Sequence, residues 1–153
     1  MELRSRINAA MKQAMKDKST ERLSTIRLIN AAIKDRDIAA RTEGKENGVA
    51  DDEVLAILAK MTKQRQESAK TYEEAGRLDL SERELSEIKV IEEFLPTQLS
   101  EDEINSAVES VIKEVGASSI RDMGKVMGAL KRKYAGQMDF GVVGSLVKNN
   151  LSS

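Results

Sequence analysis

Paired carboxylates are the side chains of this sequence best suited by type to acid–base chemistry. They occur at residues 51–52, 73–74 and 92–93, and the 153-residue chain has no histidine or cysteine to assist them. Neighbouring residues on a helix point in different directions, so these pairs do not converge on one substrate atom. We therefore predict that they cap helices or lie on exposed faces, and we expect no catalytic residue, no cofactor and no metal site.

Positive charge gathers near the glycine-containing motif Gly124-Lys125-Val126-Met127-Gly128. The motif is too short for a nucleotide-binding loop, and no predicted strand precedes it. About two turns later on the same predicted helix come three consecutive cations, Lys131, Arg132 and Lys133. Together with Lys125 they can bind phosphate groups. Alternatively, cations near a helix C-terminus simply complement the helix dipole, and the spacing alone leaves both interpretations open.

Four polar residues interrupt the apolar stripe of a long helix that is predicted to begin at residues 51–52. These residues are Gln64, Arg65, Ser68 and Tyr72. Polar side chains in a buried stripe need hydrogen-bond partners. We therefore expect an interhelix polar network here rather than a ligand site.

The elements that must hold these residues are predicted to be helices, so we expect an all-α protein. The chain has one proline, and only 3% of its residues are aromatic, which disfavours a sheet. Apolar residues recur at the helical period from the first segment to the last. A Ser-x-x-Glu pattern at Ser81 and Glu84 predicts the start of the helix before Pro96.

Pro96 marks the predicted boundary between two lobes, because proline ends a helix. A second capping-box pattern, Ser100 with Glu103, starts a new helix directly afterwards. We predict an N-terminal helical lobe, residues 1–95, and a C-terminal three-helix lobe, residues 96–153. In the second lobe, Gly136 is expected to form a turn and Asp139 to cap the last helix, while Gly124 is expected to serve packing or a turn.

The charges are unevenly distributed along the chain. Residues 1–41 carry a net charge of +5, residues 42–103 of −9 and residues 104–153 of +3, which sum to the formal charge of −1. Basic ends permit an anionic partner, although solvated helix faces explain the same pattern. The chain opens without the pattern of a secretory signal peptide, and no apolar run approaches the roughly 20 residues of a membrane span. We therefore expect a cytoplasmic protein that does not cross a membrane.

Several longer motifs resemble the YqeY family, in order and over nearly the whole chain. They occupy residues 23–34, Lys63-Gln64-Arg65-Gln66-Glu67-Ser68, Tyr72, residues 75–80, residues 93–100, residues 124–127 and residues 136–139. The family's Gly-x-Val-Met element falls on Gly124, Val126 and Met127, and its Gly-x-x-Asp turn on Gly136 and Asp139. Phe140 stands where the tails of tRNA-dependent amidotransferases often have proline, a departure that affects helix initiation more than any ligand.

The resemblance implies a fold similar to the tail of the B subunit of the glutamyl/aspartyl-tRNA amidotransferase, an all-helical region that helps to hold tRNA. It therefore implies a non-catalytic accessory module that binds tRNA or another structured RNA, with Lys125, Lys131, Arg132 and Lys133 contacting phosphates. The alternative is a protein-interaction adaptor attached to an amidotransferase or another translation complex. Only two phenylalanines and two tyrosines are present, so base stacking is expected to contribute little to RNA binding.

Overall fold

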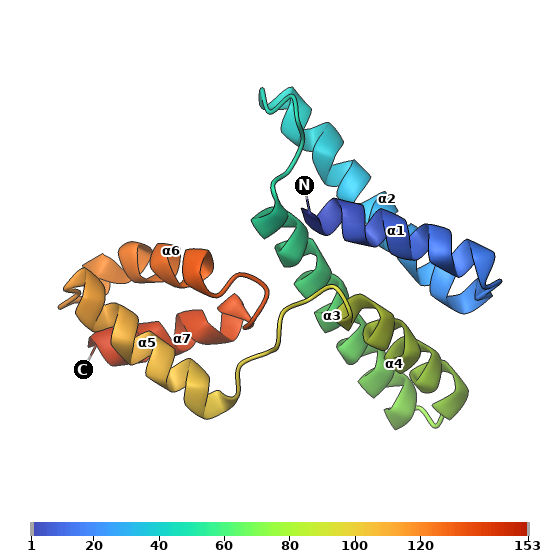
Figure 1. The fold of residues 1–153 in the computed structure, drawn as a ribbon. Coiled ribbons are helices and arrows are strands. Elements are labelled where there is room, and N and C mark those ends of the chain that lie inside the picture. Colours follow the sequence, from blue (N-terminus) through green and yellow to red (C-terminus); the bar gives the residue numbers. More distant parts are fainter. Residues whose placement is uncertain (1, 153) are drawn as a thin grey trace. The chain divides into compact units, whose positions relative to one another are not determined.

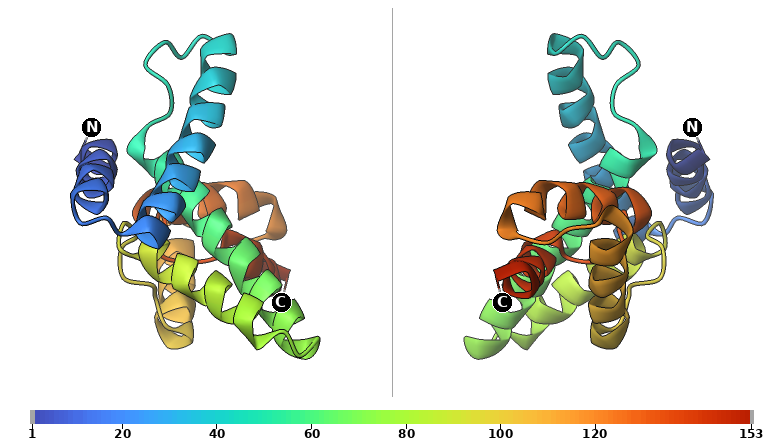
Figure 2. Two further views of the ribbon diagram at one scale, coloured as in Figure 1. Left: turned by 90° about the vertical axis from the view of Figure 1, so that its right-hand side faces the viewer. Right: turned by 90° about the vertical axis from the view of Figure 1, so that its left-hand side faces the viewer.

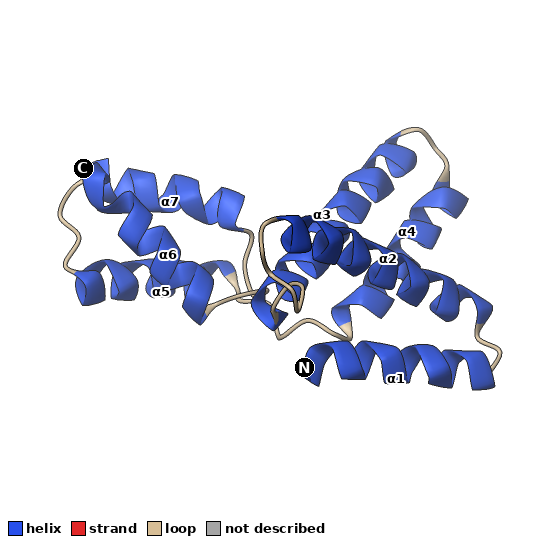
Figure 3. Cartoon of the chain, turned by 90° about the horizontal axis from the view of Figure 1, so that it is seen from above, coloured by secondary structure: helices blue, strands red, loops and turns tan. Residues whose placement is uncertain are grey.

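The computed structural model describes residues 2–152 of the chain, and within them every regular element is a helix and no strand occurs (Figure 3). The prediction of an all-α protein is confirmed. The described residues divide between Leu95 and Pro96 into two compact units, the N-terminal and the C-terminal unit.

The N-terminal unit contains four helices, labelled in Figure 1: α1 (Glu2–Lys16), α2 (Thr20–Thr42), α3 (Asp51–Glu74) and α4 (Leu78–Glu92). Helix α1 packs against α2, and α3 and α4 form an antiparallel pair that lies side by side in every view (Figures 1 and 2). Helix α3 has 24 residues and is therefore about 36 Å long. Its apolar stripe is buried through Val54, Leu58 and Met61, which places the core of the unit along one side of this helix.

The start of α3 has the expected local chemistry, whereas the start of α4 does not. Three carboxylates occupy the first turn of α3, where their negative charge interacts favourably with the positive end of the helix dipole. Helix α4 begins at Leu78, one turn before the predicted Ser81. The backbone N–H of Ser81 donates to the Arg77 carbonyl at 3.1 Å, and its side chain is buried. The Ser-x-x-Glu pattern thus lies inside the helix, so that prediction was wrong.

The C-terminal unit contains α5 (Glu101–Val115), the short 3₁₀ helix η1 (Ile120–Asp122), α6 (Met123–Lys133) and α7 (Phe140–Ser152). At the start of α5 the Ser100 side chain accepts a hydrogen bond from the Glu103 N–H at 3.2 Å, and Glu103 accepts from the Ser100 N–H at 3.0 Å. The helix ends at Gly116, whose φ of 69° is left-handed and suits glycine. The three α-helices enclose the core residues Val108, Val111, Val126, Leu130, Val143 and Val147.

The segment around Pro96 is held within each unit. Phe94 is buried in the core of the N-terminal unit. On the other side of the proline, Gln98 donates to the Gly136 carbonyl at 2.5 Å, and the Leu99 N–H donates to the Gln137 carbonyl at 3.0 Å. Residues 98–99 are therefore part of the C-terminal unit and anchor the loop between α6 and α7.

An ion pair fixes the long α2–α3 loop onto the first two helices. Arg4 donates to both oxygens of Asp37, at 2.8 and 2.5 Å, and also to the Val49 carbonyl at 2.9 Å. The Val49 N–H donates to the same carboxylate at 2.9 Å, and the Val49 side chain is buried. Gly48 has a φ of 80°, and a Cβ there would collide with the Asp37 carboxylate. Arg4 and Asp37 thus join α1, α2 and the loop at one point.

We predict that Asp37→Asn destabilises the protein in a pH-dependent way. The hydrogen bond from Arg4, aided by the Val49 N–H, lowers the pKa of Asp37 from 3.8 to about 2 against the opposing effect of partial burial. A lowered pKa stabilises the folded state above the unfolded-state pKa, and this contribution disappears as pH falls from about 4 to about 2. The free energy of unfolding of the variant should lie about 2 kcal/mol below that of the wild type at pH 6.

Urea unfolding between pH 6 and pH 2 measures this difference, which should shrink below pH 4. Asp35→Asn is the matched control, because Asp35 lies exposed on the same helix and its replacement should change stability by less than about 0.5 kcal/mol. A stability difference that stays constant across the pH range would show that the charge of Asp37 does not stabilise the contact between Arg4, Asp37 and the α2–α3 loop.

Candidate nucleic-acid interface

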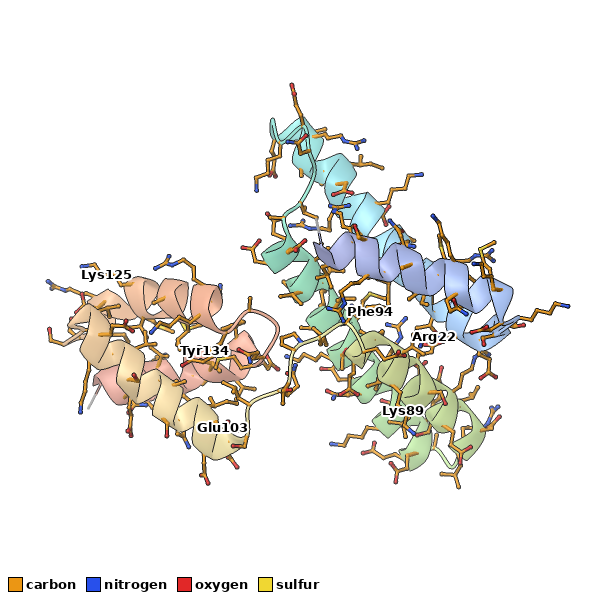
Figure 4. The ribbon with its side chains drawn as sticks, in the orientation of Figure 1. Arg22, Lys89, Phe94, Glu103, Lys125 and Tyr134 are labelled. Carbon is orange, nitrogen blue, oxygen red and sulfur yellow. The ribbon has the colours of Figure 1, made fainter. Side chains whose placement is uncertain are left out.

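Helix α6 carries the densest positive charge of the C-terminal unit. Its eleven residues include four cations, Lys125, Lys131, Arg132 and Lys133, and no carboxylate. All four side chains are exposed, and Figure 4 shows Lys125 on the outer side of the helix. The opposite face buries Val126 and Leu130. The amphipathic pattern of the helix therefore orients the cations towards solvent.

Packing and capping contacts hold α6 in place from both sides. A Cβ at Gly144 of α7 would lie 3.8 Å from the Met127 methyl group, so α7 packs closely against this helix. At its start, Asp122 accepts hydrogen bonds from the backbone N–H groups of Ser118 and Ser119, at 3.0 and 3.4 Å. These bonds, with a smaller contribution from Lys125, lower the pKa of Asp122. These contacts position α6, and with it the surface formed by Lys125, Lys131, Arg132 and Lys133.

The four cations differ in their surroundings. Lys133 pairs with Glu114 of α5, with 2.6 Å between Nζ and the carboxylate oxygen, and this bond raises the pKa of Lys133. Lys125 lies close enough to Asp122 to influence its titration. Lys131 and Arg132 form no ion pair with any other described residue. Their charges are the ones most available to an external anion.

Two glycines occur in α6 without a packing reason inside the described part of the chain. A Cβ at Gly124 would meet no atom within 4 Å, and one at Gly128 would meet only the end of Arg132, at an ordinary 3.6 Å. Gly124 therefore lies in a helix with open space around it, and neither the packing nor the turn expected of it is seen. Gly128 follows Gly124 by four residues, so both lie on the same side of the helix.

The loop between α6 and α7 contains the other two residues that the sequence singled out for a turn. Gly136 has a φ of 75°, and its carbonyl accepts the Gln98 hydrogen bond. Asp139 accepts a side-chain hydrogen bond from the Gly141 N–H at 2.9 Å, and its carbonyl accepts from the Val143 N–H at 3.0 Å. These contacts set the direction of α7 and involve no chemistry on a ligand.

Of the four polar residues predicted to form an interhelix network on α3, only one forms a hydrogen bond to a neighbouring helix. Arg65 donates from Nε to Glu87 of α4 at 2.9 Å and from Nη1 to the Met61 carbonyl at 3.1 Å. Gln64, Ser68 and Tyr72 instead line an open depression on α3 together with Glu67 and Thr71. The interhelix contact therefore involves Arg65 alone among the four predicted residues. The sequence did not indicate its partner, because Glu87 lies 22 residues away on a charged helix.

In the described part of the chain, the paired acidic residues lie at helix ends. Glu93 forms an ion pair with Arg22 across the N-terminal unit, and residues 51–52 lie in the first turn of α3. Across residues 2–152 no group of three potential metal ligands comes together. In the same range, no helix combines the length and apolar composition needed to cross a bilayer.

The chain is similar to several fungal proteins named "Altered inheritance of mitochondria protein 41, mitochondrial". The protein of Clavispora lusitaniae is 28% identical over 157 residues, which cover 99% of this chain and 86% of that protein. The protein of Pyrenophora tritici-repentis is 31% identical over 132 residues, covering 82% and 70%, and that of Lachancea thermotolerans is 33% identical over 112 residues, covering 71% and 57%.

These relatives contradict the expectation of a cytoplasmic location, because all of them are named as mitochondrial proteins. The expectation relied on the absence of an apolar leader, a criterion that detects secretory signals and not the arginine-rich amphipathic segments of mitochondrial import.

A sequence model of a known family also matches the chain, and the resemblance found in the motifs is confirmed by it. The model is that of the YqeY-like proteins, and it aligns with residues 4–151. The match includes both units and every described helix from α2 to α6. The chain therefore belongs to the family of YqeY-like proteins.

Proposed function

We propose that this protein is a non-catalytic accessory module that binds structured RNA, tRNA in particular, through the exposed face of α6. The observation that carries the proposal is the charge of this helix, which has four exposed cations and no carboxylate. Phosphate groups supply most of the affinity in protein–nucleic acid complexes, and lysine and arginine are their main partners. The resemblance to the amidotransferase tail supports the same ligand.

The distribution of charge favours local rather than general binding. Residues 96–153 contain seven Lys or Arg and seven Asp or Glu residues, so the unit as a whole is neutral. Five of the carboxylates lie on α5, whereas four of the cations lie on α6. An anionic backbone is therefore attracted to one helix and repelled by its neighbour, which gives it a preferred path.

The shape of the helix surface supports contact with a backbone rather than with bases. Gly124 leaves the main chain of α6 exposed, and at the half-buried Gly128 only the end of the Arg132 side chain lies near the missing Cβ. Tyr134, the only tyrosine of this unit, is half-buried among its helices (Figure 4) and is poorly placed to stack on a base. Recognition of shape and phosphate position is the mode by which proteins bind helical RNA.

A protein-interaction adaptor is the second candidate, and one observation favours it. Leu78 and Leu85 of α4 are 61% and 47% exposed, and their spacing of seven residues places them on one side of the helix. Paired exposed leucines are a common anchor for a partner helix. In this alternative, the protein binds an amidotransferase or another translation protein, and RNA binding is absent.

The variant Lys131→Gln/Arg132→Gln should weaken tRNA binding and reduce its dependence on salt. Loss of two phosphate contacts should lower the slope of log affinity against log salt by about 1.4 to 1.8. Fluorescence anisotropy with labelled tRNA at several salt concentrations measures both quantities. Exposed charge changes alter stability by less than about 0.5 kcal/mol each, so the variant should remain folded.

Lys12→Gln/Lys16→Gln is the matched control, because it removes the same charge from exposed positions on α1. It should leave affinity and slope near the wild-type values. Equal weakening by both double variants would show that binding is nonspecific. Absence of tRNA binding by the wild-type protein at low salt would exclude the RNA function and favour the adaptor.

Gly128→Ala should stabilise α6 and at the same time weaken tRNA binding. Alanine in a helix interior is about 0.5 to 1 kcal/mol more stable than glycine, and the added methyl group meets only an ordinary contact. The same methyl group projects into the surface that a phosphate backbone approaches. Thermal unfolding and anisotropy report the two opposing effects, and Ser110→Ala on the exposed face of α5 is the control that should not alter binding. Unchanged affinity for Gly128→Ala would exclude close approach at this residue.

A further inference from the structure

One ion pair connects the acidic helix of the C-terminal unit to the basic one. Glu114 of α5 holds the Lys133 ammonium at 2.6 Å, and the two side chains are 54% and 48% exposed. Solvent-exposed ion pairs contribute little to stability, because water and salt screen the attraction. The packing of Val108 and Val111 with Val126 and Leu130 already holds α5 against α6. The pair is therefore not needed for the fold.

The Lys133 ammonium cannot form an equally strong ion pair with Glu114 and with a phosphate group at the same time. A phosphate oxygen that approaches this ammonium either displaces the carboxylate or lies beside it, and both cost interaction energy because the two groups carry like charges. The other carboxylate near the cationic face is differently constrained. Asp122 is occupied by the backbone N–H groups of Ser118 and Ser119, so it is fixed as a cap. The Glu114 carboxylate, in contrast, accepts no backbone hydrogen bond from a described residue and contacts only Lys133.

We propose that Glu114 is an intramolecular competitor for phosphate at Lys133 and thereby sets the affinity of the α6 surface for RNA. This inference rests on the RNA-binding function proposed above. It adds a reason why the surface would bind a polyanionic chain in preference to a single phosphate. A ligand with a single phosphate gains little at Lys133, because it must replace a contact that already exists. A polyanionic chain engages Lys131 and Arg132 first, and these contacts offset the loss of the Glu114 pair.

The ligand class that follows is a polynucleotide with several adjacent phosphates, rather than a free nucleotide or inorganic phosphate. Lys131, Arg132 and Lys133 point in different directions around the helix, since consecutive residues differ by about 100°. A single phosphate cannot reach all three of them. A backbone that curves around the end of α6 can, and only such a ligand releases Glu114 at little cost.

The test is the variant Glu114→Gln, with Glu109→Gln as the matched control. Both residues are exposed carboxylates on α5, and within residues 2–152 no cation forms an ion pair with Glu109. Glutamine keeps the size of the side chain and removes its charge. We expect Glu114→Gln to bind tRNA about three to ten times more tightly, with a salt slope steeper by about 0.7 to 0.9, the value for one additional phosphate contact. Glu109→Gln should change the affinity less than about twofold, because Glu109 has no ion pair with a described cation and its exposed charge is screened by salt.

The combination Glu114→Gln/Lys133→Gln distinguishes local competition from a general change in charge. If Glu114 acts through Lys133, its replacement should have almost no effect when Lys133 is already absent. Equal tightening by Glu114→Gln and Glu109→Gln, or full tightening without Lys133, would overturn the competitor role while RNA binding itself stands. Failure of both the wild-type protein and Glu114→Gln to bind tRNA at low salt would overturn the RNA function and this inference with it.

Inorganic phosphate provides a second readout for the selection of polyanions. Added at concentrations up to about ten millimolar, it should not displace labelled tRNA from the wild-type protein more effectively than an equal ionic strength of chloride. Specific displacement by phosphate would show that a single anion occupies the surface, and it would exclude the requirement for several adjacent phosphates.

Discussion

Burial of one face of α6 is the constraint on which the C-terminal unit and its charged surface depend. The helix has eleven residues, and isolated helices of this length are marginal in water. Two glycines lower its intrinsic stability further. It persists because Val126 and Leu130 are fully buried against α5 and α7. The same burial fixes the rotation of the helix about its axis, and therefore decides that its cations face solvent.

Separation of charge between two packed helices follows from that arrangement. Because α5 and α6 share one core, their exposed faces lie on neighbouring parts of a small unit. Five carboxylates on one helix and four cations on the other create a local field although the unit is neutral. A neutral protein with a polarised surface is attracted to anions only in one orientation, which limits nonspecific association. The Glu114–Lys133 pair lies where the two regions meet.

Features that depend on local sequence could be predicted, and features that join distant residues could not. The capping box of Ser100 and the helical period were visible because both depend on residues within one or two turns. The Arg4–Asp37 and Arg65–Glu87 pairs join residues 33 and 22 positions apart, and the sequence offers many other charges at similar distances. A local pattern can also mislead. The Ser-x-x-Glu pattern at Ser81 predicted a helix start, but the same residues also fit a helix interior, where the structure places them. For the candidate site, the sequence identified the cations but not their unequal pairing.

The dipole of α6 explains three of its cations and not the fourth. Lys131, Arg132 and Lys133 occupy the last turn, where positive charge is favourable even in the absence of a ligand. Lys125 occupies the first turn, where the dipole disfavours a cation. Asp122 offsets part of this cost, but its Oδ2 already accepts hydrogen bonds from two backbone N–H groups, so its capping role does not require a lysine. Helix stability alone therefore accounts for the position of the basic triplet but not for that of Lys125, which is the cation of α6 that only the proposed binding of an anion would explain.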